Sequence, residues 1–469
     1  MKDIVILGAG ISGLSVGLKL STDSNLYLLE KESFEGGLCA SFTHKDCILD
    51  YGPHKLYSQL PGIMEEFSRI LGEDCLSVKK KNSLRFMGKC FEFPMKITQL
   101  IKNISPKTVA NGIGIGLGYS FTLLSSIIKK KENITYEDYF INGFGRQGYN
   151  VLFRDLAWKV WDDPKLLTEE LARKRVPIPS ISNLIKSAFS KKEEQKVSAE
   201  YYYYPKKGCG MLCDKIADKI KENKGEFILN SSPSSINLKD NRVESITYGS
   251  DKETKTLTTD LLISTIPISE LPKLINPLPP EEVLEAANNL KYKALIIIYL
   301  TIDTPKLMDD AWIFCLDNEV MFNRVAEQKA FGEFTIPKDK TVLMIDLTAK
   351  VGDNTWNQSD EELINSVIND LKKIGVLKEE KIIDSFVKRI KKVYPLYHVD
   401  YKKNLTKILD YISTIPNLYT IGRHGTFNYN NMDHCIDMSY IAAEHISKGK
   451  TKPEWKQKRE YFESYRIVD

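Results

Sequence analysis

The sequence predicts an α/β fold, in which a Rossmann-like domain with a parallel sheet is joined to a second domain of helices and an antiparallel sheet. The first observation behind this prediction is an apolar run at 4–7 that leads into a glycine-rich turn, a helical stretch and a second apolar run at 26–29. The second is the return of short apolar strands far along the chain, at 227–229, 260–267 and 418–421. Strands that alternate with helical stretches are typical of βαβ units and a parallel sheet.

The turn after the first strand has the GxGxxG spacing of a dinucleotide-binding site. Gly8 permits the tight turn, Gly10 lets the backbone approach a pyrophosphate, and Gly13 lets the helix pack closely on the sheet. The N-terminus of that helix offers free N–H groups and about half a positive charge to the phosphates. Glu30 ends the second apolar run, where an acid can bind a ribose hydroxyl. The turn therefore predicts binding of an adenine dinucleotide.

Length and composition bound the function. A chain of 469 residues can bury a large core and form two domains. The net charge of +4 is small against 66 basic and 62 acidic residues, so we expect no nucleic-acid partner. The eight cysteines form no CxxC pair and no metal-ligand cluster, and no signal peptide precedes the first strand. We therefore expect reduced thiols, no metal site and a cytoplasmic location. The sequence does not indicate the oligomeric state.

One stretch is long enough to span a bilayer. Residues 108–128 carry no charge, but Asn111, four glycines and several hydroxyl side chains lower their hydropathy. We expect a buried or amphipathic helix here. Peripheral membrane contact through 108–128 stays an alternative, because three lysines follow at 129–131.

Apolar periodicity and turn residues place the other elements. Helices are predicted at 61–71, 98–104, 135–144, 148–161, 212–221 and 438–446, with Thr135 as the cap of the third. Strands are predicted at 235–238 and 243–248, and strands of a second sheet at 294–302 and 341–347.

The strands of the predicted dinucleotide domain come from three separated segments. We predict a cofactor domain built from 1–61, 205–268 and 395–469, the last including a C-terminal tail, with a helical insertion at 62–204 and a mixed-sheet substrate domain at 269–394. Nicotinamide enzymes normally have a continuous Rossmann domain, whereas a domain interrupted by two insertions is the usual layout for FAD. FAD is therefore the expected cofactor.

Six segments in order along the chain resemble the FAD-dependent superfamily of amine oxidases, protoporphyrinogen oxidases and phytoene desaturases, which also holds UDP-galactopyranose mutase. They are GAGISG at 8–13, LLEK and GG within 28–37, DYGPHKLY at 50–57, YPKKGCGML at 204–212, DLLISTIP at 260–267 and GRHGTFNYNNMDHCIDM at 422–438. The segments at 51–54, 91–97, 144–161, 323–331 and 393–397 resemble the mutase branch most closely. The resemblance implies an FAD-binding domain of the glutathione-reductase type.

The resemblance also implies a cofactor site. It assigns contacts with the adenosine and the pyrophosphate to Gly8, Gly10, Gly13, Glu30, Lys31, Gly36 and Gly37. It assigns the adenine to the backbone of Val243, and the flavin and its ribityl chain to Gly422, Arg423 and Met432. Met432 precedes a helix with apolar periodicity. The N–H groups at the start of that helix would face the edge of the flavin where reduction builds negative charge.

The chain also departs from the mutases. Val176–Ser180 stands where their lid usually offers an arginine to the substrate diphosphate, and Tyr57 stands where they often carry a second histidine near the flavin. Arg324 is retained in a segment where mutases place an arginine that binds substrate phosphate. These differences weaken the mutase prediction and leave flavin binding untouched.

Several residues are candidates for catalysis or substrate binding, and most of them also have a purely structural interpretation. His54 follows a Gly-Pro turn and would lie beside the flavin, or be a structural histidine. Arg324 would bind a phosphate or carboxylate, or form a surface ion pair. The aromatic residues Trp161, Tyr394 and Tyr397 would wall a substrate cavity, or be plain core. By analogy with amine oxidases, Lys329 would approach flavin N5.

Two reactions fit these residues. We expect an FAD-dependent oxidoreductase, in which flavin N5 accepts a hydride from an amine or a saturated C–C or C–N bond of a small molecule. The alternative is a mutase-like isomerase, in which reduced flavin N5 attacks the anomeric carbon of a nucleotide sugar and Arg324 holds the pyrophosphate. The absence of the lid arginine favours the oxidoreductase.

Overall fold

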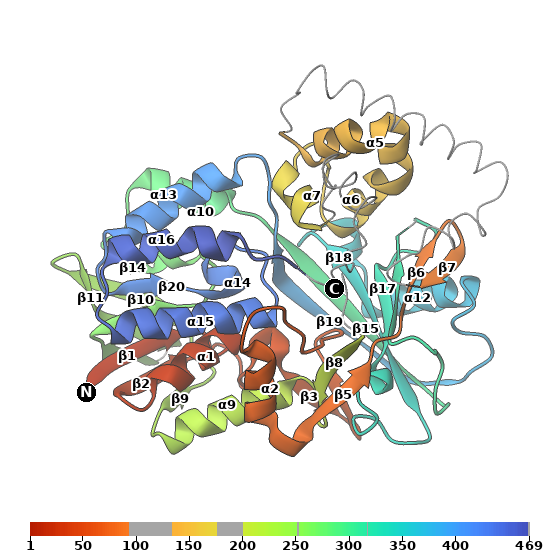
Figure 1. Ribbon diagram of the computed structural model, residues 1–469, viewed down its shortest axis with the longest axis horizontal. Coiled ribbons are helices and arrows are strands. Elements are labelled where there is room, and N and C mark those ends of the chain that lie inside the picture. Colours follow the sequence, from red (N-terminus) through yellow and green to blue (C-terminus); the bar gives the residue numbers. More distant parts are fainter. Residues whose placement is uncertain (93–133, 176–199, 251–252, 317, 468–469) are drawn as a thin grey trace, which may run out of the picture.

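The computed structural model describes residues 1–92, 134–175, 200–250, 253–316 and 318–467. Figure 1 shows a parallel-sheet domain beside a larger antiparallel sheet, with a small group of helices above one end of that sheet. The predicted helix at 98–104, the uncharged stretch at 108–128 and the segment at 176–180 lie outside the described residues.

Five parallel strands form the first domain, in the order β20-β13-β1-β2-β9. Their bounds are β1 Lys2–Leu7, β2 Ser24–Leu29, β9 Glu226–Ile228, β13 Leu261–Ser264 and β20 Leu418–Thr420. The strands come from three separated segments of the chain, as the sequence predicts. Residues 4–7 of β1 are completely buried, which is typical of a central strand covered on both faces.

Alternate residues of these strands pack on different layers. One face meets α1 (Ile11–Leu20), α9 (Gly210–Glu222) and α15 (Met432–Ser447). The other face meets α10 (Glu281–Asn289), α13 (Tyr401–Ser413) and a four-stranded sheet in the order β12-β11-β10-β14. Those strands are β10 Pro233–Lys239, β11 Arg242–Ser250, β12 Glu253–Thr258 and β14 Ile275–Asn276. Helices cover both faces of the parallel sheet, and the carboxyl ends of its strands point to the second domain (Figure 1).

The second domain is a seven-stranded sheet in the order β19-β15-β18-β17-β16-β6-β7. Its strands are β6 Asn82–Phe86, β7 Lys89–Glu92, β15 Tyr292–Ile302, β16 Trp312–Cys315, β17 Arg324–Glu327, β18 Thr341–Ala349 and β19 Ile382–Pro395. All pairs are antiparallel except β16 with β6. Leu295, Ile297 and Tyr299 face the first domain, and the intervening residues pack on α12 (Asp360–Lys373).

The helical group consists of α5 (Tyr136–Leu152), α6 (Arg154–Val160) and α7 (Glu169–Arg175). Thr135 caps α5, because its Oγ1 accepts the Asp138 N–H at 3.1 Å, which confirms the predicted helix start. Gly145, with φ of 73°, breaks α5 inside, close to the predicted gap between two helices.

The other elements are short or peripheral. They are β3 Ser41–His44, β4 Cys47–Asp50, α2 Ile63–Leu71, β5 Cys75–Lys79, β8 Tyr201–Pro205, α11 Asn354–Asn357, α14 Gly422–Gly425, α16 Lys452–Glu463 and the 3-10 turns Gly37–Cys39, Gly72–Asp74, Leu271–Leu274 and Gln328–Ala330. Among the helices of the described residues, none combines the length and the apolar character that crossing a membrane requires.

Candidate functional site

The glycine turn between β1 and α1 has the geometry of a phosphate cradle. Gly8 has φ of 95°, a conformation that L side chains rarely adopt. A Cβ at Gly13 would lie 2.0 Å from the Gly8 carbonyl oxygen, so only glycine lets α1 start this close to β1. A Cβ at Gly10 would meet nothing nearer than the Gly36 carbonyl oxygen at 3.9 Å, which leaves room for a ligand. No side chain caps α1, so its first N–H groups are available to an anion.

The second glycine pair packs against this turn. Gly36 donates its N–H to the Ala9 carbonyl at 2.8 Å and pairs with Gly10 in an isolated bridge. Gly36 and Gly37 have φ of 99° and 55°, in the left-handed region. A Cβ at Gly37 would lie 3.3 Å from the Gly10 Cα, so the two glycine turns touch through their backbones.

Glu30 lies at the end of β2 beside both turns. Its side chain is buried, and its carboxylate accepts the Ala9 N–H at 2.8 Å and the Glu32 N–H at 3.1 Å. The carboxylate is thus fixed next to the glycine turn, at the place where an acid binds the ribose of a dinucleotide. Lys31 points to solvent and pairs with Glu32 at 3.1 Å.

The third segment closes the cradle. Gly422 has φ of 81°, and a Cβ there would lie 2.4 Å from the Ser12 Oγ on α1. Met432 begins α15, where the Asn431 N–H donates to His434 Nδ1 at 3.1 Å. Three segments far apart in sequence thus meet around one space, with the N-termini of two helices at its edges. This arrangement fits an adenine dinucleotide with a flavin.

The prediction for Val243 is wrong. Its N–H donates to Asn417 Oδ1 at 2.9 Å, and its carbonyl accepts from Asn417 Nδ2 at 2.8 Å. The backbone of Val243 is therefore engaged by a side chain, and the residue is buried in the core beneath the parallel sheet. These groups do not face an adenine.

The predicted catalytic residues His54 and Arg324 come together with Arg423. Burial and, next, the charges of Arg324 and Arg423 lower the pKa of His54 to about 4. His54 Nδ1 is buried with no hydrogen-bond partner in the described part of the chain. At neutral pH the imidazole is uncharged, because a third cation beside two guanidinium groups is unfavourable.

Two tyrosines stand next to these arginines. The rings of Tyr394 and Tyr429 stack with centroids 5.5 Å apart, and the Arg423 guanidinium lies 5.7 and 5.9 Å from them. Arg423 Nε donates to the Asn430 carbonyl at 2.6 Å, which fixes the direction of the side chain. Arg324 donates to Asp346 Oδ2 through Nε at 3.0 Å and Nη2 at 2.5 Å. Two arginines and one carboxylate leave this region with a net positive charge.

Two aromatic candidates and one lysine lie elsewhere than beside the arginines. Trp161 and Tyr397, 5% and 1% exposed, are part of a hydrophobic core, which favours the plainer alternative for both. Lys329 donates to the carbonyls of Pro337, Lys338 and Lys340, away from the cradle.

Sequence reasoning missed Lys293. This residue pairs with Tyr394 across β15 and β19, so the two side chains lie on the same face of the sheet. It is 5% exposed, and the charged groups that act on its ammonium are Asp162, Lys350 and Asp353. Burial lowers its pKa. A lysine directly before the apolar run at 294–302 is the signal that could have found it.

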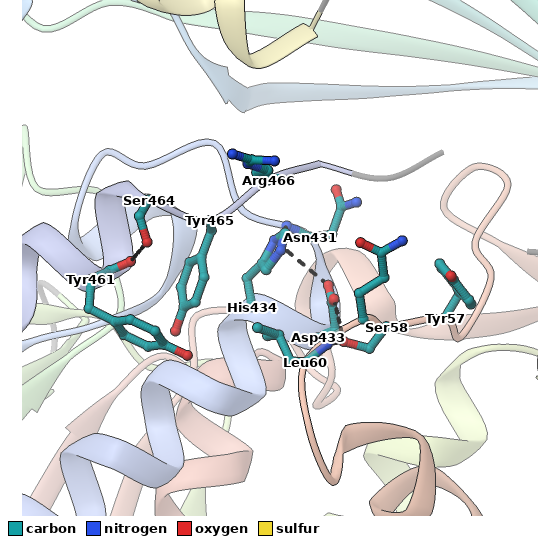
Figure 2. A pocket seen from close by; sticks show the side chains of 11 residues that line it. Tyr57, Ser58, Leu60, Asn431, Asp433, His434, Tyr461, Ser464, Tyr465 and Arg466 are labelled. Carbon is teal, nitrogen blue, oxygen red and sulfur yellow. Dashed lines mark hydrogen bonds and ion pairs between the residues drawn. The ribbon is translucent and has the colours of Figure 1, made fainter. Parts of the chain in front are cut away.

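A cavity of about 200 Å³ lies at the N-terminus of α15. Figure 2 shows how the loop around Ser58, the first turn of α15 and the C-terminal residues Tyr465 and Arg466 surround it. Ser58 Oγ donates to Asp433 Oδ2 at 2.7 Å, and the ring of Tyr465 stacks on His434. This cavity is too small for a dinucleotide and borders the flavin end of the cradle. Across the described residues, no three His, Cys, Asp or Glu side chains gather as metal ligands would.

The lowered pKa of His54 predicts a pH effect on stability. Between pH 6.5 and 4, the unfolded chain takes up a proton at this residue that the folded protein does not. The free energy of unfolding therefore falls as the pH drops through that range. We expect His54→Gln to lose less stability than the wild type between these pH values, measured by chemical denaturation. If the free energy of unfolding falls equally with pH in the two proteins, the pKa of His54 is not lowered in the folded state.

Comparison with known proteins agrees with this geometry. The family described as flavin-containing amine oxidoreductase matches residues 178–446, and the NAD(P)-binding Rossmann-like domain matches residues 6–70. No curated protein sequence matches the chain.

Several solved structures share the fold. Reduced UDP-galactopyranose mutase has a TM-score of 0.76 at 18% identity, over 96% of this chain and 94% of the other. A protein named as a protoporphyrinogen oxidase from Exiguobacterium sp. 255-15 has a TM-score of 0.70 at 17% identity, over 96% and 99%. Cyclohexylamine oxidase from Brevibacterium oxydans IH-35A has a TM-score of 0.66 at 12% identity, over 96% and 99%. At these identities the likeness shows the fold alone.

Proposed function

Because the chain belongs to the flavin-containing amine oxidoreductase family, we propose that it is an FAD-dependent oxidoreductase whose substrate is an anionic small molecule. The observation that carries the choice of substrate is that the charges of Arg324 and Arg423 both act on His54. A cationic amine would be repelled by two guanidinium groups at this place, whereas a carboxylate or phosphate would be attracted.

Each part of the site has a task in this proposal. The glycine turns and the N-terminus of α1 bind the pyrophosphate of FAD, and Glu30 binds the ribose. When bound, the flavin supplies the acceptor for a hydride at N5. Arg423, held by the Asn430 carbonyl, orients the anionic group of the substrate. His54 stays neutral and offers Nδ1 as a hydrogen-bond acceptor.

A second candidate is isomerisation of a nucleotide sugar, the reaction of a UDP-galactopyranose mutase. The observation that favours it is the combination of Arg324, Arg423 and the tyrosine pair at one place. Guanidinium groups bind the oxygens of a diphosphate with paired hydrogen bonds, and tyrosine hydroxyls can supply further ones. Arg423 could thus replace the arginine that is absent from residues 176–180.

Anaerobic titration of the purified flavoprotein separates these reactions. The probes are protoporphyrinogen, which carries carboxylates, cyclohexylamine, which is a cation, and UDP-galactopyranose. We expect an anionic reductant such as protoporphyrinogen, and not cyclohexylamine, to bleach the flavin in proportion to its amount. Turnover of UDP-galactopyranose only after chemical reduction of the flavin would favour the mutase. Bleaching by cyclohexylamine alone would contradict the anionic substrate.

A further inference from the structure

A buried hydrogen-bonded chain links the helical group to the tyrosine pair. The Tyr397 hydroxyl accepts the Tyr429 N–H at 2.8 Å and donates to Asn428 Oδ1 at 2.9 Å. Lys174, near the end of α7, donates from Nζ to the same Asn428 oxygen at 3.2 Å. Tyr397, Asn428 and Tyr429 are each at most 5% exposed, so water does not compete for these bonds.

Asn428 is the centre of this chain and cannot turn freely. Its Nδ2 donates to the Phe462 carbonyl at 2.7 Å, so the side-chain oxygen must point to Tyr397 and Lys174. Its backbone N–H donates to the Arg423 carbonyl at 3.0 Å. The amide therefore connects α7, α16 and the segment that carries Arg423.

This series of hydrogen bonds ends at Tyr429, a residue of the candidate site. Tyr429 stacks on Tyr394, and both rings flank the Arg423 guanidinium. Because the Tyr397 hydroxyl holds the backbone of Tyr429, a displacement of that hydroxyl would move the ring that borders Arg423. Removing it would also leave a buried N–H without an acceptor, which costs more than the bond itself gains.

We propose that Tyr397 and Lys174 are positioning residues: the Tyr397 hydroxyl holds the Tyr429 backbone directly, and Lys174 fixes that hydroxyl through Asn428. Together they hold Tyr429 against Arg423 and so set the affinity for the anionic group of the substrate. This inference rests on the proposed function for the role of Arg423. It gives the helical group a direct part in substrate binding, because Lys174 belongs to α7.

The chain offers a matched control for Tyr397. Tyr401 stacks on Tyr397 with centroids 4.3 Å apart, is 5% exposed and donates its hydroxyl to Glu170 Oε2 at 2.6 Å. Tyr397→Phe and Tyr401→Phe therefore each remove one buried hydroxyl from the same ring stack. Only Tyr397→Phe removes the hydroxyl that accepts the Tyr429 N–H. In Tyr401→Phe, we expect Glu170 to keep its ion pairs with Lys174 at 3.3 Å and with Lys402 at 2.9 Å, so Lys174 stays in place.

The test combines a titration with a structure. Inorganic diphosphate is titrated into the FAD-loaded protein and its dissociation constant is read from the flavin absorbance. We expect Tyr397→Phe and Lys174→Met to raise the constant about tenfold, Lys174→Arg to restore it, and Tyr401→Phe to leave it within about twofold. Crystal structures of the variants should show Tyr429 displaced in Tyr397→Phe and in place in Tyr401→Phe.

Two outcomes would overturn the inference: equal constants in the two Phe variants, or an unmoved Tyr429 in Tyr397→Phe. A wild-type protein that does not bind diphosphate would contradict the proposed function instead. In that case the position of Tyr429 in the variant structures still decides whether Tyr397 and Lys174 position it.

Discussion

Replacing Gly13 with alanine is expected to leave the purified protein without FAD. The new Cβ would lie 2.0 Å from the Gly8 carbonyl oxygen and 3.1 Å from the Gly8 carbonyl carbon, both backbone atoms. Only a shift of α1 away from β1 can relieve this clash, and that shift moves the helix N-terminus away from the phosphates. Overpacking of this kind also costs about 1–3 kcal/mol of stability. The measurement is the ratio of flavin absorbance to protein, with the free energy of unfolding alongside.

Gly17 provides the control on the same helix. A Cβ there would lie 3.1 Å from Ile220 Cδ1, the end of a flexible side chain that can move by a few tenths of an ångström. Alanine is also the better helix former by about 1 kcal/mol. We therefore expect Gly17→Ala to fold and to keep its FAD. If Gly13→Ala keeps as much FAD as Gly17→Ala, the cradle is not where the structure places it.

Replacing Arg423 with alanine is expected to weaken the binding of inorganic diphosphate by about 1.5–3 kcal/mol, the worth of a charge-assisted hydrogen bond. Arg423 donates one hydrogen bond to the Asn430 carbonyl, so its loss should affect folding little. Titration of the FAD-loaded variant gives the dissociation constant, and calorimetry gives the melting temperature. A partly exposed arginine on β19, Arg389, which pairs with Asp360, serves as the control, and its replacement should leave the affinity unchanged.

Arg324 needs a different variant. Its partner Asp346 has a side chain only 6% exposed, so alanine at 324 would leave a buried carboxylate unpaired and destabilise the protein by about 3–5 kcal/mol. Arg324→Met combined with Asp346→Asn removes both charges together. We expect this double variant to fold and to bind diphosphate about tenfold or more weakly. Wild-type affinity in both this variant and Arg423→Ala would exclude these arginines from the site.

The cofactor side of the site could be predicted from the sequence because its signals are local. The roles of Gly8, Gly10 and Gly13 depend on backbone geometry within one turn, and Glu30 is the residue directly after the next strand. The long, mostly apolar strands at 294–302 and 341–347 were found for the same reason. Strand β19 was missed, since its 14 residues carry several charges between the apolar ones.

The substrate side depends on contacts between distant segments, which one sequence does not show. Val243 was assigned to adenine, but Asn417, 174 positions away, occupies its backbone groups. Arg423 was expected only along the flavin, and its meeting with Arg324 follows from the way the sheet docks on the parallel domain. Lys293 was overlooked because a lysine at the start of a strand is usually exposed.

The identity of the bound cofactor tests the proposed FAD site most directly. The protein would be purified without added nucleotide and denatured, and the released ligand identified by mass spectrometry and quantified against the protein. The glycine cradle, Glu30 and the N-termini of α1 and α15 predict FAD, at one molecule per chain and lost in Gly13→Ala. Release of FMN, or of a nicotinamide dinucleotide in place of FAD, would contradict the account.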